Sequence, residues 1–309
     1  MVGKVAVVGC GLIGAGWASW FLSRGLSVTC HDPAPGSETR ARRAVADNLR
    51  SIGHPEAEQQ QLLSGLSFEP DIEKAVSGAG WIQENAPEDL QLKREVIRRI
   101  DGASAPGVVI ASSTSSIRMS QLQAGMTHPE RLVAGHPFLP VYLIPLVEVA
   151  GGESTAIAAL DAAMNFYRSV GKQPIRLKRE VTGHVANRLQ AALMREAFFM
   201  LQEGIASAED IDLALTEGPG LRWATTGPFV SHALAGGEGG ARQAFASLGA
   251  AMKNMWADLG VPTLTPELEA LVVAGARDIL ARKSADRWMA ERQRVVRAIQ
   301  REKAAIRGE

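Results

Sequence analysis

The chain has 309 residues, of which 46% are hydrophobic and 21% charged, and its 33 basic side chains balance its 33 acidic ones. This length suggests about two domains, and the composition is ordinary for a soluble globular protein. A net charge of zero argues against charge-driven binding to nucleic acid or to a membrane surface. No apolar run is long enough to span a bilayer, and the opening MVGKVAVVGC enters a strand pattern without signal-peptide features.

The first half alternates β-branched runs with amphipathic stretches. Strands are expected at Lys4–Val8, Ser27–His31, Trp81–Glu84, Val108–Ala111, Leu132–Gly135, Val147–Ala150 and Gln173–Leu177. Helices are expected between them, among others at Ile13–Arg24, Thr39–Ser51 and Glu88–Asp101. Such alternation predicts parallel strands joined by crossover helices, which is a doubly wound α/β sheet.

Beyond Val181 the pattern becomes helical. The segment NRLQAALMREAFFMLQEGI has apolar residues close to a 3.6-residue period, and later segments open with Ser or Pro and acidic residues, as helices do. We therefore expect a Rossmann-type domain over residues 1–181 and an all-helical domain over residues 182–309.

The strongest motif follows the first predicted strand. VAVVGCGLIGAG carries Gly9-x-Gly11-x-x-Gly14 and continues into a helix. Gly9 permits a tight turn, Gly11 lets a pyrophosphate approach the backbone, and Gly14 allows close packing of helix on strand. Free N–H groups at the helix start, at Leu12 and Ile13, would hold the phosphates.

An acidic residue completes the dinucleotide pattern. Asp32 follows the second predicted strand at close to the spacing expected for an acid that binds a ribose 2′-hydroxyl. Its charge would repel the extra phosphate of NADP, so NAD is the expected cofactor. The alternatives are a glycine-rich turn without ligand and an Asp32 that only caps the turn before Pro33.

A dehydrogenase that oxidises an alcohol needs a base for the hydroxyl proton. Of the six histidines, five are set aside: His31 abuts Asp32 and is expected beside the adenosine, His54 and His128 precede prolines in polar loops, His184 begins a predicted helix, and His232 lies in a loop of small residues. His136 remains, at the end of an apolar strand, where doubly wound sheets place their functional residues. Glu148 lies on the next apolar run and, if the two runs pair, would orient the imidazole and stabilise its charged form. The alternative is a satisfied core ion pair.

Cysteines and metal motifs add little. Cys10 and Cys30 lie at or near the ends of the first two predicted strands, so we expect no structural disulfide and a reducing compartment, the cytoplasm. No C-x-x-C or H-E-x-x-H spacing occurs, and no metal is expected.

Several segments together resemble the 3-hydroxyacyl-CoA dehydrogenase superfamily over nearly the full length of the chain. They are VAVVGCGLIGAGWA, QENAPEDLQLKREV, IASSTSSI, GHPF-x-PVYLIPLVEV, EVTGHVANRLQ and EGPGLRWATTGPF. The resemblance implies catalytic roles for Ser115, His136, Glu148 and Asn187. It also implies that Glu88 and Lys93 lie near the nicotinamide ribose.

The implied roles agree with the chemistry of these side chains. Ser115 and Asn187 can donate hydrogen bonds to the substrate oxygen as it becomes an alkoxide or a carbonyl. All four residues also have an interpretation without a catalytic or cofactor role. Ser115 could belong to a loop that caps a helix, and Asn187 could be a polar residue at a domain hinge. Glu88 and Lys93 could be a solvated ion pair.

Two positions depart from the family pattern. Leu139 stands where H-x-F-N-P usually has asparagine, and Ser113 replaces the asparagine usual in the serine loop. Two amides near the nicotinamide are therefore absent, which leaves the histidine–glutamate pair intact and predicts a drier pocket.

The resemblance is greatest to the branch of this family that acts on small hydroxy acids. It implies oxidation of a 3-hydroxy acid, first of all L-carnitine to 3-dehydrocarnitine. A carboxylate and a quaternary ammonium would need a cation and aromatic faces. The candidates are Arg222, Trp223, Phe229, Phe138 and Tyr142, each of which could equally be core packing.

Other functions stay open at this point. L-gulonate or a 3-hydroxyacyl-CoA could be the substrate, and the chain could instead be an NAD-binding structural or regulatory protein like the family's lens crystallin. The family's helical domain usually forms a homodimer. The apolar runs Ala191–Leu201 and Leu268–Val273 suit either a subunit interface or an internal core.

Overall fold

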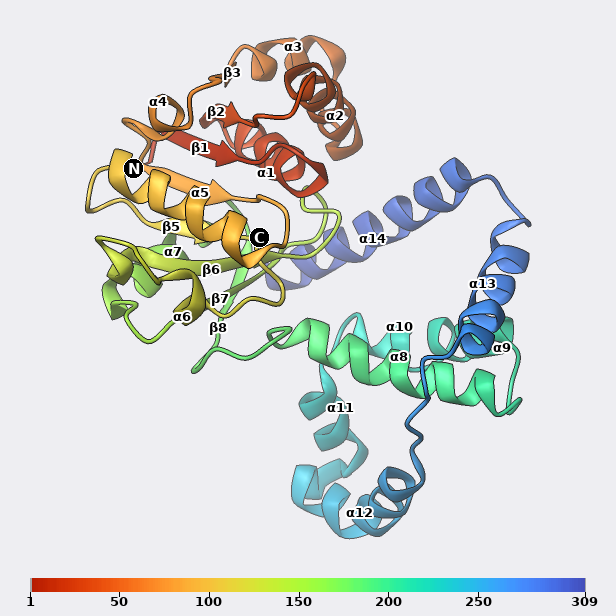
Figure 1. Cartoon of the computed structure of the whole chain (residues 1–309). Helices are drawn as coiled ribbons and strands as arrows, with labels where there is room; N and C mark the ends of the chain where they lie inside the picture. The colour runs from red at the N-terminus through yellow and green to blue at the C-terminus, as the bar shows by residue number, and fades with distance from the viewer. Residues whose placement is uncertain (1, 309) are drawn as a thin grey trace. The chain divides into compact units, whose positions relative to one another are not determined.

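A mixed eight-stranded sheet organises the first part of the chain in the computed structural model, which describes residues 2–308 (Figure 1). The chain divides into two compact units, a first unit through Arg188 and a second unit from Leu189. The strand order is β3-β2-β1-β4-β5-β6-β7-β8. The strands are β1 Lys4–Val8, β2 Ser27–His31, β3 Leu66–Phe68, β4 Trp81–Glu84, β5 Ile110–Ser112, β6 Leu132–Pro137, β7 Leu146–Gly151 and β8 Gln173–Arg176.

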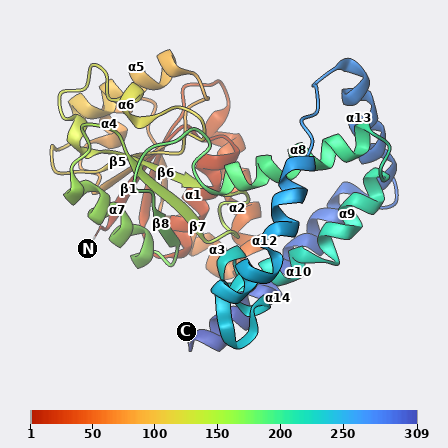
Figure 2. The same cartoon turned by 90° about the horizontal axis from the view of Figure 1, so that it is seen from below.

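Helices cover both faces of this sheet. They are α1 Leu12–Ser23, α2 Ser37–Ile52, α3 Glu56–Leu63, α4 Ile72–Val76, α5 Leu90–Ala103, α6 Met119–Leu122 and α7 Ile157–Ser169. Along β1, Val5 and Val7 face the core that contains α1, α2 and α7, whereas Ala6 and Val8 face the core that contains α4, α5 and α6. Figure 2 shows α4, α5 and α6 together on one side of the strands. A continuous apolar run suits a strand that is buried on both faces.

The predicted doubly wound α/β class is confirmed, with corrections in detail. Strands β6 and β7 are antiparallel, and no helix joins them. Only residues 138–145 connect the two strands, and a parallel crossover needs a dozen residues or more. The edge strand β3 is not predicted from the sequence, because its three residues, LSF, are too few to show an alternating pattern.

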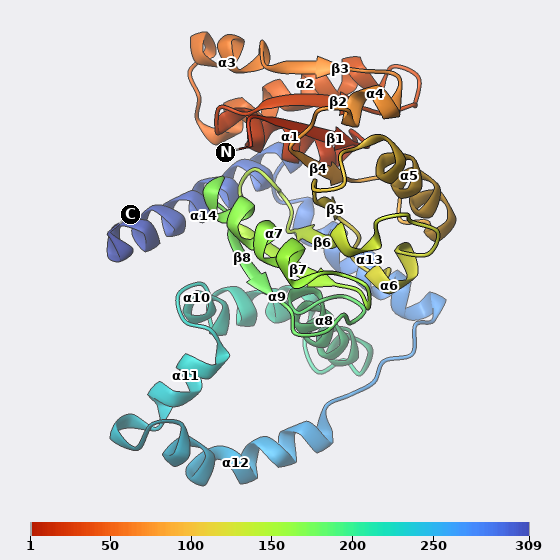
Figure 3. The same cartoon turned by 90° about the vertical axis from the view of Figure 1, so that its left-hand side faces the viewer.

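The second unit is helical over its described residues. Its helices are α8 Ala186–Gln202, which begins in the first unit, α9 Ala208–Thr216, α10 Pro219–Trp223, α11 Pro228–Ala235, α12 Gly240–Asp258, α13 Pro266–Leu280 and α14 Ala285–Arg307. Figure 3 shows α11 and α12 extending away from α8 and α9 rather than packing into a bundle with them. Within the described part of this unit, the only buried hydrophobic residues are Ala244 and Leu268.

Candidate active site

The turn between β1 and α1 is too tight for side chains at two of its three glycines. Gly9 has a φ of +84°, and a Cβ there would lie 2.7 Å from the carbonyl carbon and oxygen of Asn85. A Cβ on Gly14 would lie 1.8 Å from the carbonyl oxygen of Gly9. At Gly11, by contrast, an added Cβ meets no atom within 4 Å. Gly9 and Gly14 therefore shape the turn, and Gly11 leaves room for a ligand to approach the backbone.

The start of α1 supplies unpaired donors beside that open space. Gly11 caps the helix without a side-chain hydrogen bond, and the first turn has no acidic residue. Leu12 is exposed and Ile13 half-buried. The first N–H groups of a helix have no partner within it and attract anions, so this end fits a pyrophosphate.

Asp32 is joined to the same turn. Its Oδ2 accepts a hydrogen bond from the Cys10 N–H at 2.8 Å, and its Oδ1 accepts one from the Ala34 N–H at 2.9 Å. Each carboxylate oxygen keeps a second acceptor site. A half-buried carboxylate held beside the turn fits a cofactor with a free ribose 2′-hydroxyl. The residues present thus fit NAD.

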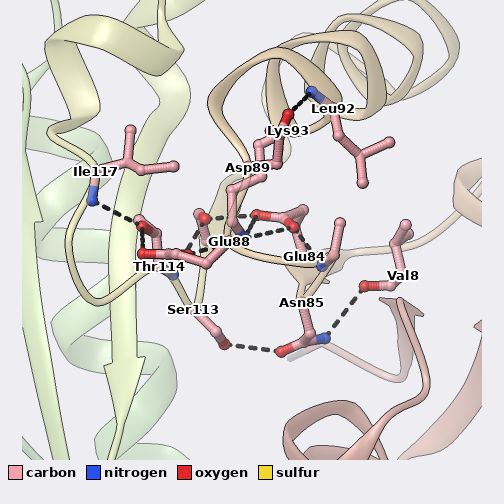
Figure 4. Close-up of polar contacts among 12 residues, drawn as sticks. Val8, Glu84, Asn85, Glu88, Asp89, Leu92, Lys93, Ser113, Thr114 and Ile117 are labelled. Atoms are coloured by element: carbon pink, nitrogen blue, oxygen red, sulfur yellow. Dashed lines mark hydrogen bonds and ion pairs between the residues drawn. The ribbon is translucent and has the colours of Figure 1, made fainter. Parts of the chain in front are cut away.

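Glu88 and Lys93 are engaged by protein groups. The Lys93 Nζ lies 3.0 Å from the buried Glu84 Oε1 and 3.7 Å from the Glu88 Oε2. Oε1 of Glu88 accepts a hydrogen bond from the Thr114 Oγ1 at 2.7 Å (Figure 4). It also accepts hydrogen bonds from the Ser115 N–H at 3.0 Å and from both the N–H and the hydroxyl of Ser116 at 2.8 Å. Glu88 therefore anchors the loop that carries Ser115.

These bonds decide the ionisation of Glu88. Burial alone would raise the pKa of its carboxyl, but the hydrogen bonds from Thr114 and Ser116, together with the charge of Lys93, lower this pKa to about 2. Glu88 is therefore a carboxylate at any physiological pH. A contact of Glu88 or Lys93 with a nicotinamide ribose stays a prediction.

His136 and Glu148 face each other across β6 and β7. The antiparallel register puts them directly opposite, and the His136 Nδ1 lies 2.9 Å from the Glu148 Oε2. Both side chains are buried. Because a carboxylate only accepts, Nδ1 carries the hydrogen and Nε2 keeps its lone pair in the neutral imidazole. The pair therefore has the arrangement of an oriented general base.

The other oxygen of Glu148 is bound by the entry of α8. Its Oε1 accepts hydrogen bonds from the Val185 N–H at 2.8 Å and the Ala186 N–H at 2.9 Å. Burial would raise the pKa of Glu148, but the bonds from His136, Ala186 and Val185 together lower it below its ordinary value. The partner of His136 thus stays charged. These two amides carry no sequence signal, because any residue types would supply them.

Ser115 and Asn187 lie on segments attached to this pair. Ser115 is half-buried in the loop after β5, and its carbonyl oxygen accepts a hydrogen bond from the Gly183 N–H at 3.2 Å. Asn187 is the second residue of α8, directly after the amide that binds Glu148. Their contacts with a substrate oxygen remain predictions.

The two departures from the family pattern occupy different settings. Ser113 accepts hydrogen bonds from the Trp17 Nε1 at 3.1 Å and the Gln83 Nε2 at 3.0 Å, and donates to the Asn85 Oδ1 at 2.7 Å. It is thus integrated into a buried network. Leu139 is 50% exposed, so it is not part of the buried core.

The five predicted substrate residues lie in two units. Phe138 and Tyr142 follow β6 in the first unit, and Phe138 packs edge-on to His136 with ring centroids 5.7 Å apart. Arg222 and Trp223 lie in α10 and Phe229 in α11 of the second unit, all three exposed. The aromatic cage that they were predicted to form stays a prediction.

One residue was misjudged from sequence. His184, expected at the start of a helix, instead lies in a turn before α8 with its ring 4.9 Å from that of His136. The sequence signal that could have identified it is its position: His184 lies between Gly183 and the start of the predicted helix that carries Asn187.

Comparison with known proteins assigns the chain to a family. The NAD-binding domain model of 3-hydroxyacyl-CoA dehydrogenase matches residues 4–181, and the model of its C-terminal domain matches residues 183–259. The chain belongs to the 3-hydroxyacyl-CoA dehydrogenase family. It is therefore an NAD-dependent dehydrogenase that acts on a CH–OH group, which confirms the predicted reaction class and cofactor.

Two curated relatives and one solved structure illustrate the similarity. L-carnitine dehydrogenase of Streptomyces coelicolor is 48% identical over 96% of this chain and 93% of the relative. That of Pseudomonas aeruginosa is 45% identical over 88% of this chain and 85% of the relative. The crystal structure of 5-formyl-3-hydroxy-2-methylpyridine 4-carboxylic acid 5-dehydrogenase superposes with a TM-score of 0.81 at 31% identity, covering 97% of this chain and 98% of that one.

No helix within residues 2–308 combines the length and apolar character needed to cross a membrane. No group of three or more His, Cys, Asp or Glu side chains in the same part of the chain is arranged to hold a metal ion.

Proposed function

We propose that this enzyme oxidises L-carnitine to 3-dehydrocarnitine with NAD, using His136 as the general base. The observation that carries the chemistry is the buried His136–Glu148 pair, whose geometry leaves the Nε2 lone pair as the proton acceptor. The relatives named L-carnitine dehydrogenase support the choice of substrate.

The side chains divide the work. His136 takes the proton of the C3 hydroxyl at Nε2, and Glu148 stabilises the imidazolium that forms. Ser115 and Asn187 donate hydrogen bonds to the C3 oxygen as its charge changes. When bound, NAD supplies the hydride acceptor. The glycine turn and Asp32 orient the cofactor.

For the substrate ends, Arg222 pairs with the carboxylate of carnitine. Its trimethylammonium group needs aromatic faces, since a quaternary cation binds aromatic faces and cannot donate hydrogen bonds. The candidates are Trp223 and Phe229 of the second unit and, separately, Phe138 and Tyr142 of the first. On this proposal Trp223→Ala raises KM for carnitine by about tenfold, in line with ~1–2 kcal/mol for a desolvated cation–π contact, and leaves KM for NAD unchanged. An unchanged KM for carnitine would remove Trp223 from the cage.

A substrate panel tests the function as a whole. NADH formation is measured with L-carnitine, L-gulonate and 3-hydroxybutyryl-CoA, and L-carnitine is expected to have the highest kcat/KM. Preference for either of the others overturns the substrate assignment. NAD binding without turnover of any of them would favour a structural or regulatory protein instead.

We further propose that the enzyme is a homodimer formed through the second unit. Large apolar side chains on that unit are exposed, among them Phe245 at 62% and Trp256 at 63%. An isolated subunit would leave this apolar surface in water.

A cytoplasmic location is part of the same proposal. The two described cysteines, Cys10 and Cys30, are free thiols, which suits a reducing compartment. Fractionation of cells that express the protein tests this, and recovery outside the cytoplasmic fraction would contradict it.

A further inference from the structure

His184 contacts three of the segments that form the proposed site. It is 5% exposed, and its ring lies 4.9 Å from that of His136 at an interplanar angle of 34°. Its Nε2 lies 3.0 Å from the carbonyl oxygen of Thr114, in the loop of Ser115. Its own main chain leads directly into the two amides that bind Glu148.

The contact with Thr114 fixes the tautomer. A carbonyl oxygen only accepts, so Nε2 of His184 carries the hydrogen. Nδ1 is then an unprotonated nitrogen, and it is buried without a hydrogen-bond partner among the described residues. Protonating it would create a buried donor without acceptor and a positive charge beside His136. Burial, together with the nearby His136, lowers the pKa of His184 below its ordinary value, which keeps the ring neutral.

Two groups therefore hold the Ser115 loop through different atoms. Glu88 accepts hydrogen bonds from its amides and hydroxyls, whereas the segment that contains His184 donates to its carbonyls. The latter bonds run from the Gly183 N–H to the Ser115 oxygen and from the His184 Nε2–H to the Thr114 oxygen. Donors and acceptors of the loop are thus satisfied separately, and His184 supplies the side-chain donor.

The backbone of His184 indicates that this side chain is needed. Its φ is +49°, and it is the only non-glycine residue with a positive φ among those described. Such a conformation is strained for a residue with a Cβ and persists only where the surroundings enforce it. Glycine would relieve the strain, but it would remove the donor to Thr114.

We infer that His184 is a positioning residue: its neutral Nε2–H holds the Ser115 loop in register with His136. This inference rests on the proposed function, because it assumes that Ser115 contacts the substrate. His184 itself transfers no proton.

Two substitutions of His184 distinguish the role of its N–H donor from that of its ring, because both replacements keep a Cβ and hence the same backbone strain. His184→Phe keeps a ring beside His136 and loses the donor, whereas His184→Gln keeps an amide N–H at a similar reach and loses the ring. Misplacing a reacting group by ~1 Å costs roughly 100-fold in rate, so His184→Phe is expected to lower kcat for L-carnitine by about 10- to 100-fold. KM for NAD stays the same, and His184→Gln recovers most of kcat. Thermal midpoints of both variants confirm that each is folded.

A double-mutant cycle shows whether His184 acts through Ser115. His184→Phe is expected to cause little further loss in a Ser115→Ala background. Wild-type kcat in His184→Phe, equal losses in the Phe and Gln variants, or losses that multiply in the double variant would each overturn the positioning role. Wild-type turnover in Ser115→Ala alone would instead count against the proposed catalytic site.

Discussion

At the scale of single residues, two carboxylates hold the main-chain segments that present the predicted catalytic groups. Glu88 binds the loop of Ser115, and Glu148 binds the amides before Asn187 while also orienting His136. The pKa values of both carboxyls are lowered because hydrogen bonds outweigh the cost of burial. Charge on these two side chains is therefore a condition for the geometry of the site.

The substitution Glu148→Gln tests whether the negative charge of Glu148 is needed for His136 to act as a base. A glutamine keeps the shape but cannot stabilise an imidazolium, and it permits the wrong tautomer of His136. We expect kcat for oxidation to fall by roughly 100- to 10,000-fold, the upper figure being the loss for the corresponding change in a serine protease. KM for NAD should change little, and a kcat within about threefold of wild type would contradict the role of Glu148.

The pH dependence follows from the same pair. The pKa of Glu148 lies below its ordinary value of 4.5, so its carboxyl is ionised at every pH used for assay. The stabilisation that the carboxylate gives to the fold is lost only as the pH falls below 4.5. His136 must be neutral to accept a proton, so the wild-type oxidation rate should rise toward alkaline pH and the reverse reaction should prefer lower pH. A flat profile in both directions would contradict this.

The sequence patterns identify the side chains to which we assign the chemistry, but not the main-chain and side-chain groups that hold them. His136, Glu148 and Asp32 were identifiable because each follows or lies on an apolar strand. The amides of Val185 and Ala186 were not, because a backbone donor has no residue type. The sequence does not single out His184, because its positive φ and its contact with Thr114 become visible only in the folded structure.

At the scale of secondary-structure elements, the β1–α1 turn distinguishes two kinds of glycine. Gly14→Ala places a Cβ against the Gly9 carbonyl, so we expect a loss of about 3 kcal/mol or more in unfolding free energy. Gly11→Ala meets no protein atom and should change stability by less than about 1 kcal/mol. It should still weaken NAD binding by roughly tenfold or more, because the methyl group occupies the path of the pyrophosphate.

Urea denaturation and NAD titration of the two variants check this contrast. Gly11→Ala serves as the control for Gly14→Ala, since both add the same methyl group to the same turn. Equal stability of the two variants, or full NAD affinity in Gly11→Ala, would contradict the assignment.

The connection between β6 and β7 depends on a buried lysine. The Lys172 Nζ donates to the carbonyl oxygens of Val141 and Ile144 and lies 4.2 Å from the ring centroid of Trp20. Burial and the charge of Arg24 lower the pKa of Lys172 from 10.5 to about 7. This connection also carries the predicted substrate residues Phe138 and Tyr142, so Lys172 stabilises the segment on which they lie.

Lys172→Met should remove both hydrogen bonds and lower the unfolding free energy by about 1–3 kcal/mol. Between pH 7 and 10.5 the unfolded chain binds more protons at Lys172 than the folded chain, so this group makes the wild type more stable as the pH rises. The stability difference from Lys172→Met should therefore grow between pH 7 and 9 in urea denaturation. A difference that shrinks over this interval would contradict the lowered pKa.

Element boundaries show where sequence patterns stop being sufficient. The predicted limits of β1, β2 and β4 agree with the observed ones, because each strand is a short apolar run that begins and ends at polar residues or glycines. The alternating pattern predicts parallel strands throughout, which is wrong for β6 and β7, and it is their antiparallel pairing that puts His136 opposite Glu148. Strand direction depends on the length of the connection, which an alternating pattern alone does not report.

At the scale of the whole molecule, the two units differ in how they bury apolar surface. The first unit packs two hydrophobic cores against its sheet. The second unit, within its described residues, buries only Ala244 and Leu268 among hydrophobic side chains and leaves Phe245 and Trp256 of α12 exposed. A tryptophan buries roughly 150–250 Å² when it enters an interface, and stable interfaces bury about 1,200–2,000 Å² in total. The exposed apolar side chains of this unit can account for such an area.

The homodimer proposal is tested by adding a charge to α12. Trp256→Glu should weaken the dimer by about 100-fold or more, because interface tryptophans commonly contribute 2 kcal/mol or more and a buried unpaired charge is costly. Asn254→Glu introduces the same side chain at an exposed position on the opposite face of the same helix and should leave the dimer intact. Sedimentation equilibrium measures the subunit mass of each. A monomeric wild type, or a Trp256→Glu variant as dimeric as Asn254→Glu, would contradict an interface at α12.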